Sequence, residues 1–304
     1  MSWMIRGALA LACVASLTGC GMFRHRRPPP VAVHTVVGPP YAAGGTMEYP
    51  RAQFDYDATG LAVVQAGHGP ATADGAPWSD ANMVASHPTL QLPAVARVTN
   101  LETGRELLVR LDDRGPGVAG RLLGVSPRVA ALLGPGSEPG VLRVRVRIDE
   151  AASRALTAQN GEPPGETVAV TTAPRAGVSE HSLAPPAGIV AGGGRTAYSG
   201  PAPAVAAVAP ASVVPLRLPE QVTTVPPNPG ALYVEAGVFS RPDYARLLAA
   251  RLAGEGAQLS TSYNAPRDRA YRVRIGPLPN VAAADAVLDR TRRAGVSGAH
   301  ILID

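Results

Sequence analysis

Two neighbouring aspartates, Asp112 and Asp113, end an apolar stretch and stand directly before the run Arg-Gly-Pro-Gly. In that stretch Leu107, Val109 and Leu111 alternate with other residues, the period of two that predicts a β-strand. The glycines and the proline that follow predict a tight turn. Adjacent strand residues face opposite sides, so we expect Asp112 to point away from Asp113. A carboxylate where a strand opens into a loop can meet a ligand, which makes Asp113 the first candidate functional residue.

The composition indicates small folded modules joined by flexible segments. The chain has 304 residues, with 33 glycines and 31 prolines that are unevenly spread and only 4% aromatic residues. The net charge of +5 is carried by arginine alone and is dispersed along the chain. This charge gives no argument for a nucleic-acid partner.

The N-terminus has the pattern of a bacterial lipoprotein leader. One positive charge in Met1–Arg6 precedes the apolar run Gly7–Leu17, which is too short to span a bilayer as a mature helix. The run ends in Leu-Thr-Gly-Cys, so residues 1–19 are predicted to be a signal peptide and Cys20 the lipidated first residue of the mature chain. Residues 20–36 are predicted to be an extended tether. The alternative is an ordinary secretory signal with a chance cysteine.

Further motifs lie in order around the Asp113 stretch. They are Thr-Ala-Asp-Gly at 72–75, Ala-Ser-His-Pro-Thr-Leu-Gln-Leu-Pro at 85–93 and Asp-Arg-Gly-Pro at 113–116. Together they resemble the core signature of the rare lipoprotein A family, although Asp74 and Asp112 stand where that family has asparagine. The resemblance covers residues 37–150 and implies a small all-β domain, a double-psi β-barrel. Short alternating segments such as Val141–Ile148 fit such a closed barrel.

The rest of the chain divides in two. Residues 151–229 are dominated by proline, alanine, glycine, threonine and valine, and are predicted to be a disordered linker. Residues 230–304 alternate strand and helix patterns in the order βαββαβ, and their opening Tyr-Val-Glu-Ala-Gly-Val-Phe resembles a sporulation-related-repeat (SPOR) domain. The expected fold class is therefore multidomain, an all-β barrel followed by an α+β, ferredoxin-like SPOR domain.

The resemblance implies a site in each domain. In the family the barrel is a lytic transglycosylase, so Asp113 is expected to protonate the glycosidic oxygen and then take a proton from the sugar's own 6-hydroxyl, leaving a 1,6-anhydro end. No metal and no cofactor are expected. The alternative for Arg114 and Arg121 is that they only pair with neighbouring acids. The alternative for His87 is that it satisfies a backbone group. The expected substrate-binding residues are Arg114, His87 and Arg121 in the barrel and Tyr233, Glu235, Arg272 and Arg274 on the open face of the SPOR sheet.

The chain departs from the family pattern at positions that matter to catalysis. Ala76 stands where the family has a second catalytic glutamate, and Gly124 where it often has an aspartate. Val64 and Gln65 replace two aromatic residues that would offer stacking surface to sugar rings. Two hypotheses remain: a transglycosylase that works with Asp113 alone, and a barrel that kept its fold but lost its activity and now serves a wall-binding protein.

The expected partner is peptidoglycan, as glycan strands stripped of their stem peptides. A second expected contact is the outer membrane, through the lipid on Cys20. Gly21 follows that cysteine, where an aspartate would indicate inner-membrane retention, so the periplasmic face of the outer membrane is the expected location, with enrichment at the division septum. No nucleic-acid partner is expected there.

Overall fold

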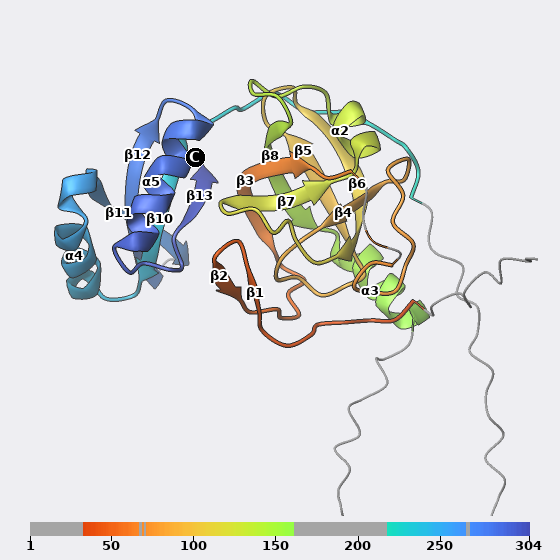
Figure 1. Cartoon of the computed structure of the whole chain (residues 1–304), viewed down its shortest axis with the longest axis horizontal. Helices are drawn as coiled ribbons and strands as arrows, with labels where there is room; N and C mark the ends of the chain where they lie inside the picture. The colour runs from red at the N-terminus through yellow and green to blue at the C-terminus, as the bar shows by residue number, and fades with distance from the viewer. Residues whose placement is uncertain (1–32, 67–68, 70, 161–217, 266–267) are drawn as a thin grey trace, which may run out of the picture. The chain divides into compact units, whose positions relative to one another are not determined.

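The computed structural model describes residues 33–66, 69, 71–160, 218–265 and 268–304 (Figure 1). The predictions for the leader, for Cys20 and for most of the linker fall outside these residues. Among the described residues, no helix is long and apolar enough to cross a membrane. Two folded parts account for most of them, and each is described by itself.

The first part is a closed β-barrel of six strands. In the sheet order β4-β7-β3-β8-β5-β6, the first strand also pairs with the last, which closes the ring. The pairs β3–β7 and β4–β6 are parallel and the others antiparallel, as a double-psi barrel requires. The strands are β3 Asp57–Val64, β4 Val84–Ser86, β5 Ala94–Asn100, β6 Arg105–Asp113, β7 Arg121–Val125 and β8 Val141–Ile148, preceded by a hairpin of β1 Tyr41–Ala43 and β2 Thr46–Glu48.

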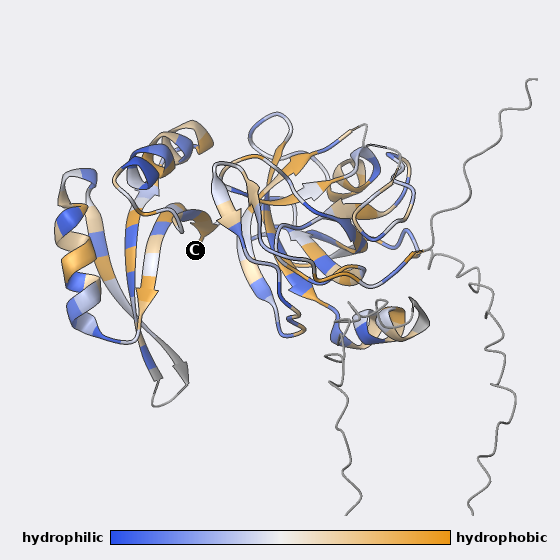
Figure 2. Cartoon of the chain, turned by 60° about the horizontal axis from the view of Figure 1, so that its bottom comes forward, coloured by the Kyte–Doolittle hydropathy of each residue, from blue (hydrophilic) through white to orange (hydrophobic). Residues whose placement is uncertain are grey.

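The barrel core follows from the alternation seen in the sequence. In β8 Leu142, Val144 and Val146 are buried, while the arginines between them lie partly or fully exposed. Figure 2 shows the same mixture of apolar and polar residues along the strands. A short helix, α2 Pro127–Leu133, begins at Ser126, whose hydroxyl accepts a hydrogen bond from the Val129 amide and caps the helix. The strand predicted at Val141–Ile148 is confirmed.

A second helix extends the barrel part beyond residue 150. Helix α3, Glu150–Asn160, packs against β5, and Ser153 and Leu156 of the helix are buried. The Ser153 hydroxyl accepts from the amide of Val95 at 2.9 Å and lies 3.1 Å from its carbonyl oxygen. The prediction of a disordered linker from residue 151 is therefore wrong for these ten residues. The alanines in this segment gave it the composition of a low-complexity linker. However, Ser153 and Leu156 lie about one helical turn apart, and the barrel buries both of them.

The linker also ends earlier than predicted. Strand β9, Thr223–Thr224, pairs antiparallel with the start of β6 and adds a seventh strand at that point. Backbone pairing with an open strand edge needs no periodic side-chain pattern, so composition did not reveal it.

The second part has the predicted βαββαβ order and the antiparallel sheet order β11-β12-β10-β13. Val234, Val273 and Ile275 are buried beneath the two helices, as the alternation predicts. The Asn280 side chain accepts a hydrogen bond from the Ala283 amide and so caps the second helix. The elements are β10 Leu232–Phe239, α4 Pro242–Arg251, a 3-10 turn Ala253–Glu255, β11 Ala257–Ala265, β12 Asp268–Leu278, α5 Val281–Arg293 and β13 His300–Ile303.

Candidate active site

Asp113 is the last residue of β6 and is held in place by two backbone amides. Its Oδ1 accepts hydrogen bonds from the Ala73 amide at 2.9 Å and from the Arg114 amide at 2.8 Å. Its own carbonyl accepts from the His87 amide at 3.0 Å. The side chain is 8% exposed. The carboxylate is therefore fixed in orientation by the turn that follows it and by the 72–75 segment, while the 85–93 segment holds the Asp113 backbone.

The Arg114 guanidinium is used within the barrel. It donates to the backbone carbonyls of Leu90 and Val37, which ties the entering chain and the loop after β4 to the Asp113 turn. Burial lowers the pKa of Arg114 below its usual value, although Tyr41 and Asp113 act in the opposite direction. The guanidinium is thus bonded to two backbone carbonyls, neither of them an acid. Its contact with substrate stays a prediction.

His87 is buried and neutral. Its Nδ1 accepts from the amides of Thr89 and Leu90, both at 3.2 Å, so this nitrogen carries no proton. The proton therefore lies on Nε2, 3.1 Å from the Tyr56 hydroxyl oxygen. Burial, with a smaller contribution from Arg114, lowers the pKa of His87 to about 3. Both ring nitrogens are occupied, so the imidazole shapes the loop beside Asp113, and a role in binding sugar stays a prediction.

The His87 geometry predicts an acid-labile barrel. Because the pKa of His87 falls from about 6.5 when unfolded to about 3 when folded, the neutral ring stabilises the fold above pH 6.5, and this contribution is lost as the pH falls toward 3. In protein lacking residues 1–20, Trp78 is the single tryptophan of the sequence, so its fluorescence reports barrel unfolding. A His87→Gln variant should have a weaker pH dependence of urea unfolding between pH 3 and 6.5; equal dependence would contradict the assignment.

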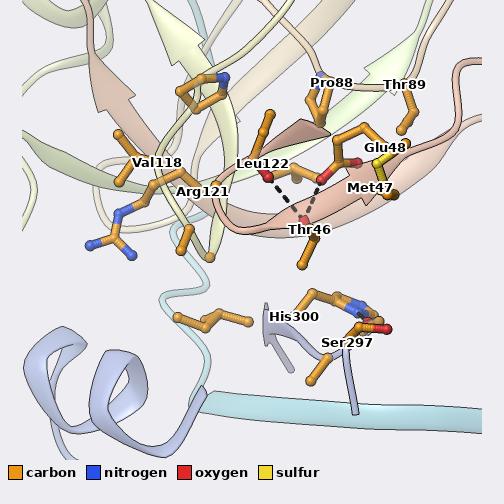
Figure 3. A pocket seen from close by; sticks show the side chains of 18 of the residues that line it. Thr46, Met47, Glu48, Pro88, Thr89, Val118, Arg121, Leu122, Ser297 and His300 are labelled. Atoms are coloured by element: carbon orange, nitrogen blue, oxygen red, sulfur yellow. Dashed lines mark hydrogen bonds between the residues drawn. The ribbon is translucent and has the colours of Figure 1, made fainter. Parts of the chain in front are cut away.

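The β1–β2 hairpin lies beside the His87 loop. The Tyr41 hydroxyl donates to the Pro88 carbonyl at 3.0 Å, which joins the hairpin to that loop. Figure 3 shows the Thr46 hydroxyl between its two oxygen contacts, the Ala43 carbonyl at 3.1 Å and Glu48 Oε1 at 3.0 Å. The neighbouring Met47 is 51% exposed. The hairpin thus forms a wall of the pocket in Figure 3 on the barrel side, with an apolar side chain open to a ligand.

Two departures from the family pattern prove to be one change in space. A Cβ placed on Gly124 would lie 1.7 Å from Oε1 of Gln65 and 2.4 Å from the Ser86 hydroxyl. Ser86 in turn donates to Gln65 Oε1. The Gln65 amide therefore fills the space in which an aspartate at position 124 would begin. With Gln65 and Ser86 in these positions, the chain has no room for a side chain at position 124.

On the other face of β6, Asp112 belongs to a buried ionic cluster. Arg110 lies between two carboxylates, with Nε 2.5 Å from Asp112 Oδ1 and a terminal nitrogen 2.9 Å from Asp74 Oδ2. Asp74 also accepts from the Thr72 hydroxyl at 2.6 Å and the Ala76 amide at 2.9 Å. All three charged side chains are at most 5% exposed. One guanidinium therefore serves two carboxylates, as expected from opposite-facing aspartates.

The cluster forms part of a cavity of about 300 Å³ that also contains Ala76. Its lining residues are Ala76, Pro77, Ala81, Asn82, Met83, Val84, Arg110, Asp112, Leu218 and Glu220. Ala76 is 3% exposed. At the position of the family glutamate this chain thus has only the buried methyl group of Ala76. The Asp74 carboxyl lies beside it and accepts a hydrogen bond from the Ala76 amide.

The cluster predicts a second pH effect. Burial raises the pKa of Asp112, with Asp74 adding to the rise and Arg110 opposing it, to about 8 from about 3.8. A raised pKa in the fold means that the stabilisation is complete below about pH 4 and is lost as the pH rises through 8. Between pH 6.5 and 8 the parent should lose up to about 1.4 kcal/mol per pH unit. Asp112→Asn should remove this slope; an unchanged slope would contradict the assignment.

Arg121 lies at the end of the loop that follows Asp113. It begins β7, which pairs in parallel with β3, and its predicted contact with substrate stays a prediction. His68 lies outside the described residues. Within the described ranges, no group of three or more His, Cys, Asp or Glu side chains could hold a metal ion.

The predicted residues of the SPOR sheet do come together on one face. Glu235 is 4% exposed, and its Oε2 lies 3.1 Å from an Arg272 terminal nitrogen and 3.6 Å from Arg274 Nε. The Arg274 guanidinium lies 5.8 Å from the centre of the Tyr233 ring and also pairs with Asp304. Glu235 thus fixes the two arginines, which remain partly exposed.

Sequence reasoning missed three members of these sites. Tyr56 was not recognised as the partner of the His87 ring, because nothing local distinguishes it. Arg110 and Asp74 were not recognised as partners of Asp112, although a signal existed. Asp74 and Asp112 both replace an asparagine of the family motif, and two added charges near one buried arginine indicate a shared ion pair.

The comparisons with known proteins agree with both folded parts. A family model described as "SPOR domain" matches residues 228–301. The chain is 34% identical over 232 residues to "Endolytic peptidoglycan transglycosylase RlpA" of Pseudomonas aeruginosa (strain UCBPP-PA14), covering 75% of this chain and 65% of that protein. The protein of the same name in Escherichia coli (strain K12) is 34% identical over 130 residues, covering 43% and 33%.

The solved structure "Crystal structure of RlpA SPOR domain from Pseudomonas aeruginosa" is also similar, at 29% identity with a TM-score of 0.22, covering 24% of this chain and 99% of that one. The chain thus spans just under two thirds of the length of the first relative. The SPOR match and the similarity to these relatives, together with the closed barrel, agree with the resemblance to the rare lipoprotein A family.

Proposed function

We propose that the barrel cleaves peptidoglycan glycan strands by lytic transglycosylation, with Asp113 as the acid and base. The observation that carries this proposal is the fixed carboxylate at the end of β6, held through one oxygen by the Ala73 and Arg114 amides. A single fixed carboxyl suffices for the chemistry. It gives its proton to the leaving glycosidic oxygen, and the carboxylate so formed takes the proton of the 6-hydroxyl as that oxygen closes onto C1.

The substrate that we propose is glycan stripped of stem peptides. The support is the SPOR face, where Arg272 and Arg274 stay partly exposed while Glu235 holds them in position. Guanidinium groups suit the lactyl carboxylates of muramic acid, which exist as free carboxylates only where no stem peptide is joined to them by an amide bond. The relatives named above carry the words "endolytic peptidoglycan transglycosylase".

We further propose that the protein is anchored by a lipid on Cys20 in the outer membrane, faces the periplasm and gathers at the division septum. The support is the lipobox sequence and Gly21 after it. Labelling of cells with an alkyne-bearing fatty acid tests the anchor. Label should be found on the parent chain and not on a Cys20→Ser variant.

The test of the activity uses protein lacking residues 1–20 and sacculi whose stem peptides an amidase has removed. Mass spectrometry of the soluble fraction should find anhydro-ended glycans. A second candidate function, a wall-binding protein without activity, is favoured by one observation: buried Ala76 leaves no carboxyl in the place of the family glutamate. Protein that pellets with the sacculi and releases nothing would establish this second function instead.

A further inference from the structure

Residues 218–230, called the strap below, run along the barrel although the sequence there looks like linker. Thr223 and Thr224 of the strap pair with Glu106 and Arg105 at the start of β6. The next amide, that of Val225, donates to the Gly104 carbonyl at 2.8 Å. The strap therefore occupies an edge of β6 that would otherwise present unpaired backbone groups.

The strap is held beyond this pairing, toward the SPOR domain. The Asn228 amide donates to the Leu101 carbonyl at 2.8 Å. An Arg143 terminal nitrogen donates to the carbonyls of Pro229 at 3.2 Å and Gly230 at 3.1 Å. The first SPOR strand begins at Leu232. The barrel thus binds the chain almost to the residue at which the SPOR domain starts.

The other end of the strap is held by side chains. Leu218 packs against the barrel core cluster. Glu220 forms a two-point ion pair with Arg128 of α2. Leu218 and Glu220 also line the cavity above Arg110 and Asp112. Contacts of three kinds, apolar, ionic and backbone, therefore act along the same segment.

We propose that the β6 edge of the barrel is a binding surface for the strap, and that this binding replaces a long connection between the two folded parts by a very short one. From α3 to Leu232 the chain has roughly 70 residues, and a flexible chain of that length has a root-mean-square span of about 45 Å. With the strap bound to the barrel, only Ala231 lies between the strap and the first strand of the SPOR domain. The strap therefore keeps glycan held by the SPOR face at a high effective concentration near the barrel.

A matched pair of variants tests the binding. Val225→Pro with Asn228→Pro removes two of the strap amides that donate to the barrel. Thr224→Pro with Asn228→Ala keeps both, because alternation directs the Thr224 amide away from β6. In hydrogen–deuterium exchange of the chain lacking residues 1–20, peptides covering residues 103–108 should exchange at least about tenfold faster in the first variant. The control and the parent should agree, and β8 should stay protected in all three.

Equal exchange at residues 103–108 in the first variant and the parent would overturn the proposal, because the strap would then not protect β6 in solution. The functional consequence rests on the proposed function. On stripped sacculi the first variant should release glycan several-fold more slowly than the control, while both pellet equally. Equal release would overturn the role of the strap in retaining glycan. A parent that releases nothing would refute the activity itself, and the exchange experiment would still decide whether the strap binds.

Discussion

Asp113→Asn is expected to lower the rate of release of anhydro-ended glycan by about 10²–10⁴-fold, the usual contribution of a single acid–base group. The substitution leaves an oxygen that can accept from the Ala73 and Arg114 amides, as Oδ1 of Asp113 does at 2.9 and 2.8 Å. The turn should therefore keep its shape. What is lost is the proton given to the leaving oxygen, because an amide cannot supply it.

Two controls separate this loss from damage to the fold or to binding. The unfolding free energy, followed by Trp78 fluorescence, should stay within about 1 kcal/mol of the parent. Pelleting with stripped sacculi should not change, since the SPOR face carries Arg272 and Arg274 on another sheet. An Asp113→Asn variant that releases glycan at the parental rate would exclude Asp113 as the acid.

Arg110→Leu is expected to destabilise the barrel by about 3–5 kcal/mol, the cost of leaving buried charge without its partner. Asp74 and Asp112 are at most 3% exposed, and both carboxylates contact this one guanidinium. The pKa of Asp112 is raised to about 8, so Asp112 is mostly protonated at pH 7. The substitution therefore leaves the buried Asp74 side chain without its guanidinium partner. Urea unfolding at pH 7, followed by Trp78 fluorescence, measures the difference.

The barrel offers a matched control for this arginine. Arg145 makes a two-point contact with Asp57 at 2.7 and 2.6 Å, but both side chains are at least 40% exposed. Arg145→Leu should cost less than about 1 kcal/mol. Adding Asp74→Asn and Asp112→Asn to Arg110→Leu should restore most of the lost stability, because no charge is then stranded. Equal effects of the two arginine substitutions would contradict the role of burial.

The strands could be predicted from the sequence because each carries its own pattern. The alternation in β8 fixed which residues are buried, and the Asp-Arg-Gly-Pro motif located the end of β6. The SPOR face could likewise be predicted, since Tyr233, Glu235, Arg272 and Arg274 follow from alternation on two strands. Both predictions depend only on the alternation of residues within a single strand.

The features that escaped prediction depend on pairing across long stretches of sequence. The ring of His87 meets Tyr56 from another segment, and Arg110 meets Asp74 through a turn that composition does not reveal. The strap binds through backbone amides, which every residue except proline carries, so Thr223–Thr224 looks no different from other linker residues. Even Gln65, which looked like a simple loss of an aromatic ring, takes its meaning from Gly124 in a distant strand.

The central claim, cleavage by the substrate's own hydroxyl with one fixed carboxyl, is tested most directly in water enriched in oxygen-18. Stripped sacculi are incubated with the chain lacking residues 1–20, and the masses of the released glycans are measured by mass spectrometry. Attack by the 6-hydroxyl should give fragments that end in anhydromuramic acid and carry no heavy oxygen, and Asp113→Asn should give none. Reducing ends labelled with oxygen-18 would show a hydrolase, and bound protein without any released fragment would show a binding module; either result would contradict the account.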